Sequence, residues 1–335
     1  MKTAFFEIDE SWQEDFFRGE FTGDLFSFFS EPLREQSVPA NADFEAISVF
    51  VGSKIDAAVL EHLPHLKFIA TRSAGFDHID ITECKKRGIA VAYVPGYGDH
   101  TVAEFTFGLI LSLSRKIYAG IDRVKELGDF SFEGLRGFDL FGKKLGVVGT
   151  GRIGKEVIKI AKGFGMEVVA NDLFKNNEAA ATLGFAYVNF DELLASADIV
   201  TFHCPLTPET RHLLNRENIL RLKPGACVVN TSRGGVIETS ALILGFEKGI
   251  LGGVALDVLE AESEMKNEKR VLFEDGSDAE NTKKILENHL LMKMPNVLMT
   301  PHMAFNSREA LEEIFRITVA SLRGFAEGKS VNLVP

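Results

Sequence analysis

The stretch "LGVVGTGRIGKEV", Leu145–Val157, carries three glycines in the pattern Gly149-x-Gly151-x-x-Gly154. An apolar, β-branched run precedes the glycines and a segment with helical spacing follows them, so we expect a strand, a tight turn and the start of a helix. In such a junction the first glycine allows the turn, the second lets the backbone approach a pyrophosphate, and the third lets the helix pack closely on the strand. Backbone N–H groups at the start of the helix then bind phosphate oxygens. The stretch predicts a dinucleotide-binding α/β fold.

An acidic residue follows where such folds hold the adenosine ribose. Asp172 ends the next apolar run, "MEVVAND", 18 residues after Gly154, close to the ~20-residue offset usual for a ribose-binding acid. Its carboxylate would repel a 2′-phosphate, and the residues after it offer no arginine to receive one, although Lys175 is near. We therefore expect NAD rather than NADP. The alternative is that Asp172 is a solvated carboxylate at a strand end.

Short strand-like runs alternate with helical segments along the chain. In the first hundred residues these runs are "TAFFEI", "ISVFV", "LKFIAT" and "GIAVAYV", and later they are "KKLGVVG", "MEVVAN", "ADIVTFH", "ACVVNTS", "LGGVALDV" and "NVLMT". Alternation of this kind indicates parallel sheets. The six later runs with their crossovers predict one doubly wound, Rossmann-type sheet.

Two longer segments predict helices that connect the halves of the chain. "TVAEFTFGLILSLSRKI", residues 101–117, predicts a mostly buried helix that begins with a capping box of Thr101 and Glu104. The amphipathic segment "SREALEEIFRITVASLRGFAEG" predicts a C-terminal helix that returns to the N-terminal half. We therefore expect a domain of residues 101–302 inserted into an α/β domain formed by residues 1–100 and 303–335.

Composition limits the class of protein. A chain of 335 residues has room for two domains, and 45% hydrophobic with 25% charged residues is typical of globular proteins. A net charge of -11 argues against nucleic acid or an anionic membrane as the main partner, and no apolar run is long enough to span a bilayer. The three cysteines are widely spaced, without a CxxC pair or a nearby histidine array. We expect a cytoplasmic, metal-free protein that binds a small anion.

Three titratable side chains follow the ends of predicted strands, where open parallel sheets bind their ligands. Arg233 follows "CVVNTS", Glu262 comes five residues after Asp257 at the end of "GGVALD", and His302 follows "NVLMTP". Taken singly, they could be a surface arginine, one acid of a charged stretch and a packed core histidine. Together at the edge of a nucleotide-binding sheet they indicate a catalytic site.

The chemistry of this set fits oxidation of a 2-hydroxy acid by NAD. An arginine stays cationic and can hold a carboxylate or carbonyl oxygen through its planar fork of donors. A histidine can take the hydroxyl proton as hydride leaves the same carbon, and return it in the reverse direction. A carboxylate beside the imidazole favours its protonated form, which reduction of a 2-ketoacid needs.

The chain resembles the D-isomer-specific 2-hydroxyacid dehydrogenases, and within them the D-lactate dehydrogenase group. The matching stretches are "TRSAGFDHIDI", "VPGYGDHTVAE", "GVVGTGRIGKEV", "FHCPLTPETRHLLN", "VVNTSRGGVIE", "ALDVLEAE" and "VLMTPHMAF". They occur in order and cover nearly the whole chain. The resemblance implies a flavodoxin-like substrate domain built from both chain ends, a Rossmann domain between them, an active site in the cleft and a homodimer.

The resemblance also implies roles for individual residues. Arg233 is similar to the arginine that orients the substrate, Glu262 to the acid that pairs with the histidine, and His302 to the catalytic acid and base. The substrate side is implied for Ala74 and Gly75, whose backbone N–H groups hold the carboxylate, and for the pocket residues Tyr97 and Phe305. Cofactor contacts are implied for Thr101, Gly149, Gly151, Arg152, Ile153, Gly154, Asp172, Cys204, Pro205, Thr231, Ser232 and, near the nicotinamide carboxamide, Asp257.

Two departures from the lactate-type pattern concern the substrate pocket. Gly52 stands where relatives often carry an aromatic residue, which indicates a pocket wider than pyruvate requires. The segment from Glu262 to His302 is longer and more charged than in many relatives. Outside the pocket, "FDHID" with His78 is expected to cap the next helix, Cys204 to pack against adenine, and His203 to be structural.

The leading hypothesis is a cytoplasmic NAD-dependent D-2-hydroxyacid dehydrogenase that works mainly as a 2-ketoacid reductase. Pyruvate is the default substrate, and a bulkier 2-ketoacid such as phenylpyruvate or 2-ketoisocaproate is the alternative. A hypothesis of another class is an NAD-sensing, corepressor-like binding protein, because that role could keep the glycine loop without turnover. The combination of arginine, acid and histidine favours the enzyme.

Overall fold

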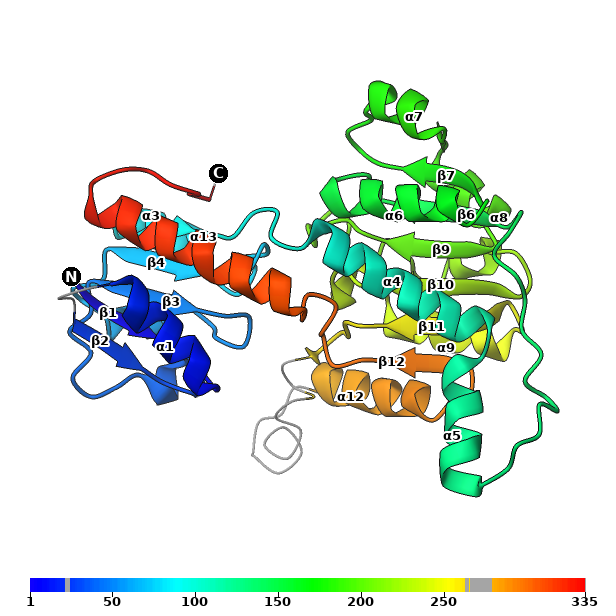
Figure 1. Ribbon diagram of the computed structural model, residues 1–335, viewed down its shortest axis with the longest axis horizontal. Coiled ribbons are helices and arrows are strands. Elements are labelled where there is room, and N and C mark those ends of the chain that lie inside the picture. The colour runs from blue at the N-terminus through cyan, green and yellow to red at the C-terminus, as the bar shows by residue number, and fades with distance from the viewer. Residues whose placement is uncertain (22–24, 263–264, 266–278, 335) are drawn as a thin grey trace. The chain divides into compact units, whose positions relative to one another are not determined.

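The computed structural model describes residues 1–335 apart from 22–24, 263–264, 266–278 and 335 (Figure 1). The chain forms two compact units, Met1–Tyr97 with Ser307–Pro335 (unit 1) and Gly98–Asn306 (unit 2). The boundaries expected from the sequence are residues 100 and 302. Most of the charged insertion expected after Glu262 lies outside the described residues.

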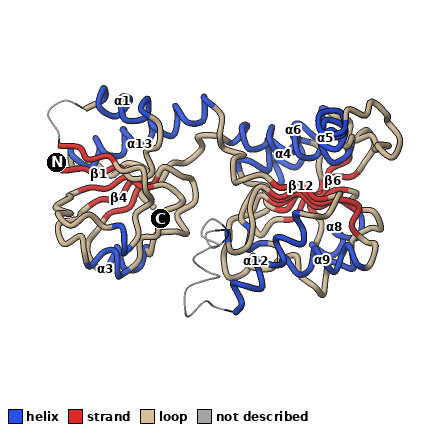
Figure 2. The backbone as a smooth tube through the Cα atoms, turned by 90° about the horizontal axis from the view of Figure 1, so that it is seen from below, coloured by secondary structure: helices blue, strands red, loops and turns tan. Residues whose placement is uncertain are grey.

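Unit 1 is built on a five-stranded sheet with the order β2-β1-β3-β4-β5, in which all neighbours are parallel. Its elements are β1 (Lys2–Phe5), α1 (Ser11–Glu20), β2 (Leu25–Phe28), β3 (Ala46–Val49), α2 (Ala57–Glu61), β4 (Phe68–Thr71), α3 (Ile81–Lys86), β5 (Ala90–Ala92) and α13 (Arg308–Ala326). Helices α1 and α13 lie on one face of the sheet and α3 on the other (Figure 2). This is the strand order of flavodoxin-like folds.

Aromatic packing attaches the C-terminal helix to the N-terminal sheet. Phe325 of α13 stacks on Phe68 of β4 with ring centroids 4.5 Å apart. In the first half of α13, the ring centroid of Phe315 lies 4.9 Å from that of Phe17 and 5.2 Å from that of Trp12, both on α1. Such ring pairs stabilise beyond their buried area, so unit 1 is completed by the last part of the chain.

Unit 2 contains a seven-stranded parallel sheet with the order β12-β11-β10-β9-β6-β7-β8. Its strands are β6 (Lys144–Val148), β7 (Glu167–Asn171), β8 (Ala186–Tyr187), β9 (Ile199–Phe202), β10 (Ala226–Asn230), β11 (Leu251–Leu256) and β12 (Val297–Met299). Its helices are α4 (Asp99–Ser114), α5 (Ile117–Leu127), α6 (Arg152–Gly163), α7 (Asn177–Leu183), α8 (Phe190–Ser196), α9 (Thr239–Glu247) and α12 (Ala279–Met292).

Helices cover both faces of this sheet: α4, α5 and α6 lie on one side, and α8, α9 and α12 on the other (Figure 2). The chain order reverses between β6 and β9, which makes a topological switch point of the Rossmann type. The predicted fold class, a doubly wound parallel sheet with a flavodoxin-like α/β unit, is therefore confirmed.

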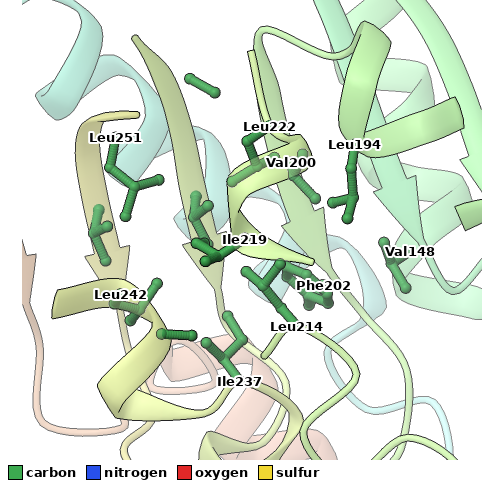
Figure 3. Packing of buried hydrophobic residues seen from close by; sticks show 14 of the residues in the cluster. Val148, Leu194, Val200, Phe202, Leu214, Ile219, Leu222, Ile237, Leu242 and Leu251 are labelled. Carbon is green, nitrogen blue, oxygen red and sulfur yellow. The ribbon is translucent and has the colours of Figure 1, made fainter. Parts of the chain in front are cut away.

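The core of unit 2 explains why its strands are almost continuously apolar. Val148, Val200 and Phe202 of the central strands belong to one cluster of buried side chains with Leu242 of α9 and Leu194 of α8 (Figure 3). Both faces of the sheet are covered, so successive side chains of a strand are buried whichever way they point. The strand ends are thereby held rigidly at one edge of the sheet.

Some details of the predicted elements are wrong. Helix α4 begins at Asp99 after Gly98, with no side-chain cap, so Thr101 lies inside the helix and does not form a capping box with Glu104. The chain then turns at Lys116 (φ 52) into the separate helix α5, which was not predicted. The short strands β2 and β8 were missed as well. Asp80 within "FDHID" caps α3 by accepting from Glu83 N, as expected.

Candidate active site

The glycine loop lies between β6 and α6 with the geometry that a pyrophosphate requires. Gly149 has φ +91, and a Cβ there would lie 2.8 Å from the backbone of His203 and Cys204. A Cβ on Gly154 would overlap the carbonyl oxygen of Gly149, whereas a Cβ on Gly151 would meet nothing within 4 Å. The loop is therefore closed on the protein side and open beside Gly151, where a phosphate can approach the N-terminus of α6.

Asp172 is held against this loop. Its carboxylate accepts hydrogen bonds from the backbone N and the Oγ1 of Thr150, at 2.6 and 2.9 Å, and from Phe174 N at 2.8 Å. The Thr150 hydroxyl also contacts the Tyr187 hydroxyl at 2.7 Å. Thr150 and Tyr187 were not identified from the sequence, although the position of Thr150 inside the glycine motif was a usable signal. The acid is thus oriented beside the loop, and its carboxylate is not merely solvated.

The other expected cofactor contacts follow strand ends at the same edge of the sheet or lie on the helices beside it. Arg152 and Ile153 start α6, Cys204 and Pro205 follow β9, Thr231 and Ser232 follow β10, and Thr101 lies in α4. Thr106 of α4 joins the group through a 2.9 Å hydrogen bond between its Oγ1 and that of Thr231. Arg152 lies 3.5 Å from the carboxylate of Asp99, which keeps its guanidinium near the loop. These residues and the open glycine loop fit a bound dinucleotide.

Burial keeps two titratable side chains of this region neutral. It raises the pKa of the Cys204 thiol to about 11, so the sulfur is not a thiolate nucleophile at neutral pH. It lowers the pKa of His203 to about 3, and the ring nitrogen Nε2 shares a hydrogen bond with Thr201 Oγ1 at 2.9 Å. A neutral thiol and a neutral imidazole suit packing more than proton transfer.

His302 and Glu262 form an acid–histidine pair. Nδ1 of His302 lies 2.9 and 3.1 Å from the two carboxylate oxygens of Glu262, and the side chains are 21% and 26% exposed. The carboxylate can only accept while ionised, so Nδ1 donates and Nε2 is the atom able to exchange a proton with a ligand. His302 has φ +54, an uncommon conformation for a residue other than glycine.

Asp257 holds the turn that carries His302. Its carboxylate accepts from Thr300 Oγ1 at 2.5 Å, Met303 N at 2.9 Å and Ala304 N at 2.8 Å, and the residue is 1% exposed. Burial raises the pKa of Asp257, while these hydrogen bonds oppose the shift. The sequence did not predict this contact, because Asp257 and the turn are more than forty positions apart. The unusual backbone at His302 is thus fixed from both sides.

Arg233 lies in the loop after β10, next to the strand that leads to Glu262. The side chain of Asn230 shapes this loop: its Nδ2 donates to Arg233 O at 2.9 Å and its Oδ1 accepts from Ser232 N and Oγ. The guanidinium donates to Ser232 O at 2.8 Å. Because β10, β11 and β12 are neighbours, the arginine, the acid and the histidine follow three adjacent strands.

The acid–histidine pair borders a pocket of about 660 Å³ within unit 2. Asp257 also lines this pocket, together with Tyr118 and a mainly apolar wall that includes Leu109, Leu259, Met292 and Leu298. An apolar wall lowers the local dielectric constant, so the attraction between Glu262 and a protonated His302 is stronger than it would be in water.

In unit 1, a rigid turn follows β4 where Ala74 and Gly75 were expected to bind a carboxylate. Ser73 Oγ donates to Gly75 O at 2.6 Å and contacts Thr71 Oγ1 at 2.8 Å. Just before the turn, Arg72 is buried and donates to Phe6 O, Glu7 O and Ser48 Oγ. Burial lowers the pKa of Arg72 only to about 10, so a positive charge remains beside the turn at neutral pH.

Gly52 has a role that the sequence did not indicate. The carboxylate of Glu7 accepts from Phe50 N and Gly52 N, both at 2.8 Å, and from Ser53 Oγ at 2.5 Å. A Cβ on Gly52 would lie 2.5 Å from Glu7 Oε1, so a side chain there requires this carboxylate to move. Tyr97 and Phe305, the expected pocket walls, are both half-buried.

Within the described residues, no group of three or more histidine, cysteine, aspartate or glutamate side chains is arranged to hold a metal ion. No helix in the same part of the chain is long and apolar enough to cross a membrane.

Comparison with known proteins identifies the family. The model of the NAD-binding domain of D-isomer-specific 2-hydroxyacid dehydrogenases matches residues 107–304. The chain is 36% identical over 308 residues to a D-lactate dehydrogenase of Escherichia coli, which covers 90% of each chain. It is 38% identical over 287 residues to an aromatic 2-oxoacid reductase of Clostridium sporogenes, covering 84% of this chain and 83% of that one.

A solved structure agrees with these matches. The D-lactate dehydrogenase from Aquifex aeolicus complexed with NAD and lactic acid has a TM-score of 0.86 and 36% identity, over 97% of this chain and 96% of that one. The chain belongs to the D-isomer-specific 2-hydroxyacid dehydrogenase family. It is an oxidoreductase, and its cofactor is NAD, which confirms the two predictions made from the glycine loop and the strand-end residues.

Proposed function

We propose that this enzyme reduces a 2-ketoacid, pyruvate by default, to the D-2-hydroxy acid, and catalyses the reverse oxidation. The observation that carries the proposal is the contact between His302 Nδ1 and Glu262, at the edge of a dinucleotide-binding sheet. When bound, NADH supplies the hydride and NAD accepts it. The residues of the chain bind the ketoacid, orient it and move the proton.

In this mechanism His302 is the acid and base. Its Nε2 donates a proton to the carbonyl oxygen during reduction and removes the hydroxyl proton during oxidation. Glu262 stabilises the protonated imidazole and fixes its orientation, as a carboxylate that accepts a hydrogen bond from a catalytic histidine does. Arg233 binds the carbonyl oxygen or the carboxylate and polarises the carbonyl. The N–H groups at Ala74 and Gly75 bind the substrate carboxylate, favoured by the buried Arg72.

The cofactor is held by the residues that surround the glycine loop. Gly149, Gly151, Arg152, Ile153 and Gly154 bind the pyrophosphate, and Asp172 binds the ribose hydroxyls. Thr101, Cys204, Pro205, Thr231, Ser232 and Asp257 complete the binding surface. A preference for NAD over NADP follows, because the ionised Asp172 repels a 2′-phosphate.

The size of the substrate side chain depends on Tyr97, Phe305 and the loop at Gly52. Relatives of this chain include both a D-lactate dehydrogenase and an aromatic 2-oxoacid reductase, so phenylpyruvate and 2-ketoisocaproate are the alternatives to pyruvate. Initial rates of NADH oxidation with pyruvate, 2-ketoisocaproate, phenylpyruvate, hydroxypyruvate and glyoxylate test the proposal. Turnover of at least one ketoacid to the D-product is expected, and no turnover of any of them would contradict it.

A homodimer is the expected assembly, and α5 is the surface that supports it. The helix exposes apolar side chains at Ile117, Tyr118, Ile121, Val124 and Leu127, and the following segment exposes Phe130 and Phe132, which are 91% and 89% exposed. A contiguous apolar surface of this kind is typical of an interface. The apolar side chains of α5 recur every three to four residues and so form one stripe along the helix. The same stripe on a second copy of the chain is a matching partner for it.

Light scattering after size-exclusion chromatography tests this assembly. The double variant Ile121→Lys with Val124→Lys is expected to run as a monomer, while Lys125→Gln on the same helix leaves the dimer intact. A wild-type chain that is monomeric at micromolar concentration would contradict the proposed dimer. The cytoplasmic location stays a prediction.

A further inference from the structure

A second acid–histidine pair lies beside the first. Glu260, two residues before Glu262, accepts from His212 Nε2 at 2.7 Å and from Thr239 N at 2.7 Å. Its backbone carbonyl accepts from Asn288 Nδ2 at 2.9 Å. The Glu260 side chain is 3% exposed and that of His212 is 31% exposed. This acid is therefore fixed by three separate parts of unit 2, and it is not an alternative partner for His302.

Unusual backbone conformations mark both pairs. Among the described residues, six that are not glycine have positive φ, and three of these are His212 (φ 51), Ala261 (φ 54) and His302 (φ 54). Ala261 is the single residue between the two acids. Such conformations persist only where the surrounding contacts impose them. At Ala261 the backbone directs the Glu260 side chain to His212 and the Glu262 side chain to His302.

The loop that carries Arg233 packs closely against the backbone of Leu259 and Glu260, which leads to Ala261. A Cβ on Gly234 would overlap the carbonyl group of Leu259 and would lie 2.5 Å from Glu260 N. The backbone on the other side of this loop is tied to His212, because His212 N donates to Gly235 O at 2.8 Å. The residue that follows the proposed substrate-orienting arginine thus contacts the backbone that leads to the proposed acid.

We propose that His212 and Glu260 are positioning residues that place the Glu262 carboxylate on the His302 imidazole. The inference rests on the proposed function, since it assigns a role within that mechanism. Glu260 and His212 touch neither substrate nor cofactor in it. Their contribution is to fix the backbone at Ala261, so that a small rotation there cannot withdraw Glu262 from His302.

In the described part of the chain, a small set of charged side chains faces the two pairs. Glu260 faces His212 and, 3.7 Å away, Lys284, which itself pairs with Glu280 at 2.8 Å. The charge of Arg211 also acts on Lys284 and Glu280. Among the described residues, the titratable groups that line the pocket of His302 are Glu262, Asp257 and Tyr118. Substituting His212 changes none of these groups near His302, so an altered titration of His302 would report a change in the position of Glu262.

The informative variants are His212→Leu, which removes the donor to Glu260, and His212→Gln, which keeps a side-chain N–H donor. In His212→Leu, kcat for ketoacid reduction at pH 7.5 should fall by about 10- to 100-fold, because a slight displacement of a catalytic group is costly. The alkaline midpoint of its kcat/KM profile should move to lower pH by about half a unit or more. His212→Gln should retain most of the wild-type kcat and a midpoint close to that of wild type. NADH affinity should change by less than about threefold in either variant.

A merely structural role would lower the active fraction and leave the pH midpoint unchanged. The proposal is therefore overturned if the His212→Leu profile has the wild-type midpoint, or if His212→Gln is impaired as strongly as His212→Leu. His65→Leu, at an exposed histidine of unit 1, is the matched control and should behave as wild type. If His212→Leu does not fold, Glu260→Gln takes its place and the same midpoint decides.

A second readout separates this inference from the proposed function. The imidazole C–H signal of His302 is assigned by its loss in His302→Asn, and its titration is followed by NMR without substrate. A lower midpoint in His212→Leu than in wild type supports the positioning role even if no ketoacid is turned over. An identical midpoint contradicts the positioning role even if pyruvate reduction is rapid.

Discussion

Replacing Glu262 with Gln is expected to move the alkaline limit of ketoacid reduction to lower pH. Reduction needs a protonated His302, and the carboxylate 2.9 Å from Nδ1 stabilises that form. An amide of nearly the same size keeps a hydrogen-bonding oxygen near the ring but removes the negative charge. As pH rises, the protonated form of His302 is then lost at a lower pH, so the rate of reduction falls mainly at alkaline pH. Oxidation of the hydroxy acid needs the neutral imidazole, so its pH range extends to more acidic pH.

The geometry of the pair gives the size of the shift. The two oxygens lie 2.9 and 3.1 Å from Nδ1, and the side chains are 21% and 26% exposed, so the effective dielectric constant lies between those of water and a protein surface site. A charge pair at this distance is then worth on the order of 1 to 3 kcal/mol. Since about 1.4 kcal/mol is a tenfold change in an equilibrium constant, the rate of reduction at alkaline pH should fall by about 5- to 150-fold relative to wild type.

The assay is the pH dependence of kcat/KM for reduction of the best ketoacid, followed by NADH absorbance from pH 5 to 10. Glu312→Gln, which removes an exposed acid that pairs with Arg308 on α13, serves as the control and should leave the profile in place. A Glu262→Gln profile that coincides with wild type would refute the reasoning, because the carboxylate would then contribute nothing to the charge state of the acid.

Other substitutions test the cofactor loop and the loop at Gly52. Asp172→Ala should weaken NADH binding by about 10- to 100-fold, as loss of hydrogen bonds to a charged group does, and should narrow its advantage over NADPH; equal losses for both cofactors in a fluorescence titration would show that the ribose is held elsewhere. Gly154→Ala should reduce NADH affinity at least about tenfold, because the Gly149 carbonyl must move; calorimetry giving the wild-type value would contradict the loop geometry. Gly52→Ala should destabilise the chain by about 1 to 3 kcal/mol in urea unfolding, and adding Glu7→Ala should recover part of that loss; strictly additive effects would exclude the steric conflict.

The sequence predicts those parts of the site that depend on local spacing. The glycine loop was identified because its three glycines lie between a strand and a helix, and Asp172 because it ends the next strand. His302 and Glu262 were paired because strand ends of one parallel sheet meet at one edge, although each residue alone has an ordinary interpretation. The family resemblance then supplied Ala74, Gly75 and the pocket residues.

What the sequence does not predict is set by contacts between distant segments. The hydrogen bond between Asp257 and Thr300 in the turn of His302 links residues more than forty positions apart. The hydrogen bond between Glu7 and Gly52 links residues 45 positions apart. Left-handed conformations at His212, Ala261 and His302 leave no mark on residue type, because none of these is glycine. The apolar side chains of α5 repeat at helical spacing, a usable signal for the helix, but the sequence does not show that they face outward, since a pattern does not say which face is buried.

The most direct test of the proposed mechanism is the rate of ketoacid reduction by His302→Asn at saturating NADH. Asparagine keeps a polar side chain of related shape but cannot act as a proton donor at neutral pH. General acid catalysis contributes about 10²- to 10⁴-fold, so kcat should fall by that factor while NADH affinity stays within about threefold of wild type. A variant that reduces the ketoacid at the wild-type rate would contradict the assignment of His302 as the acid.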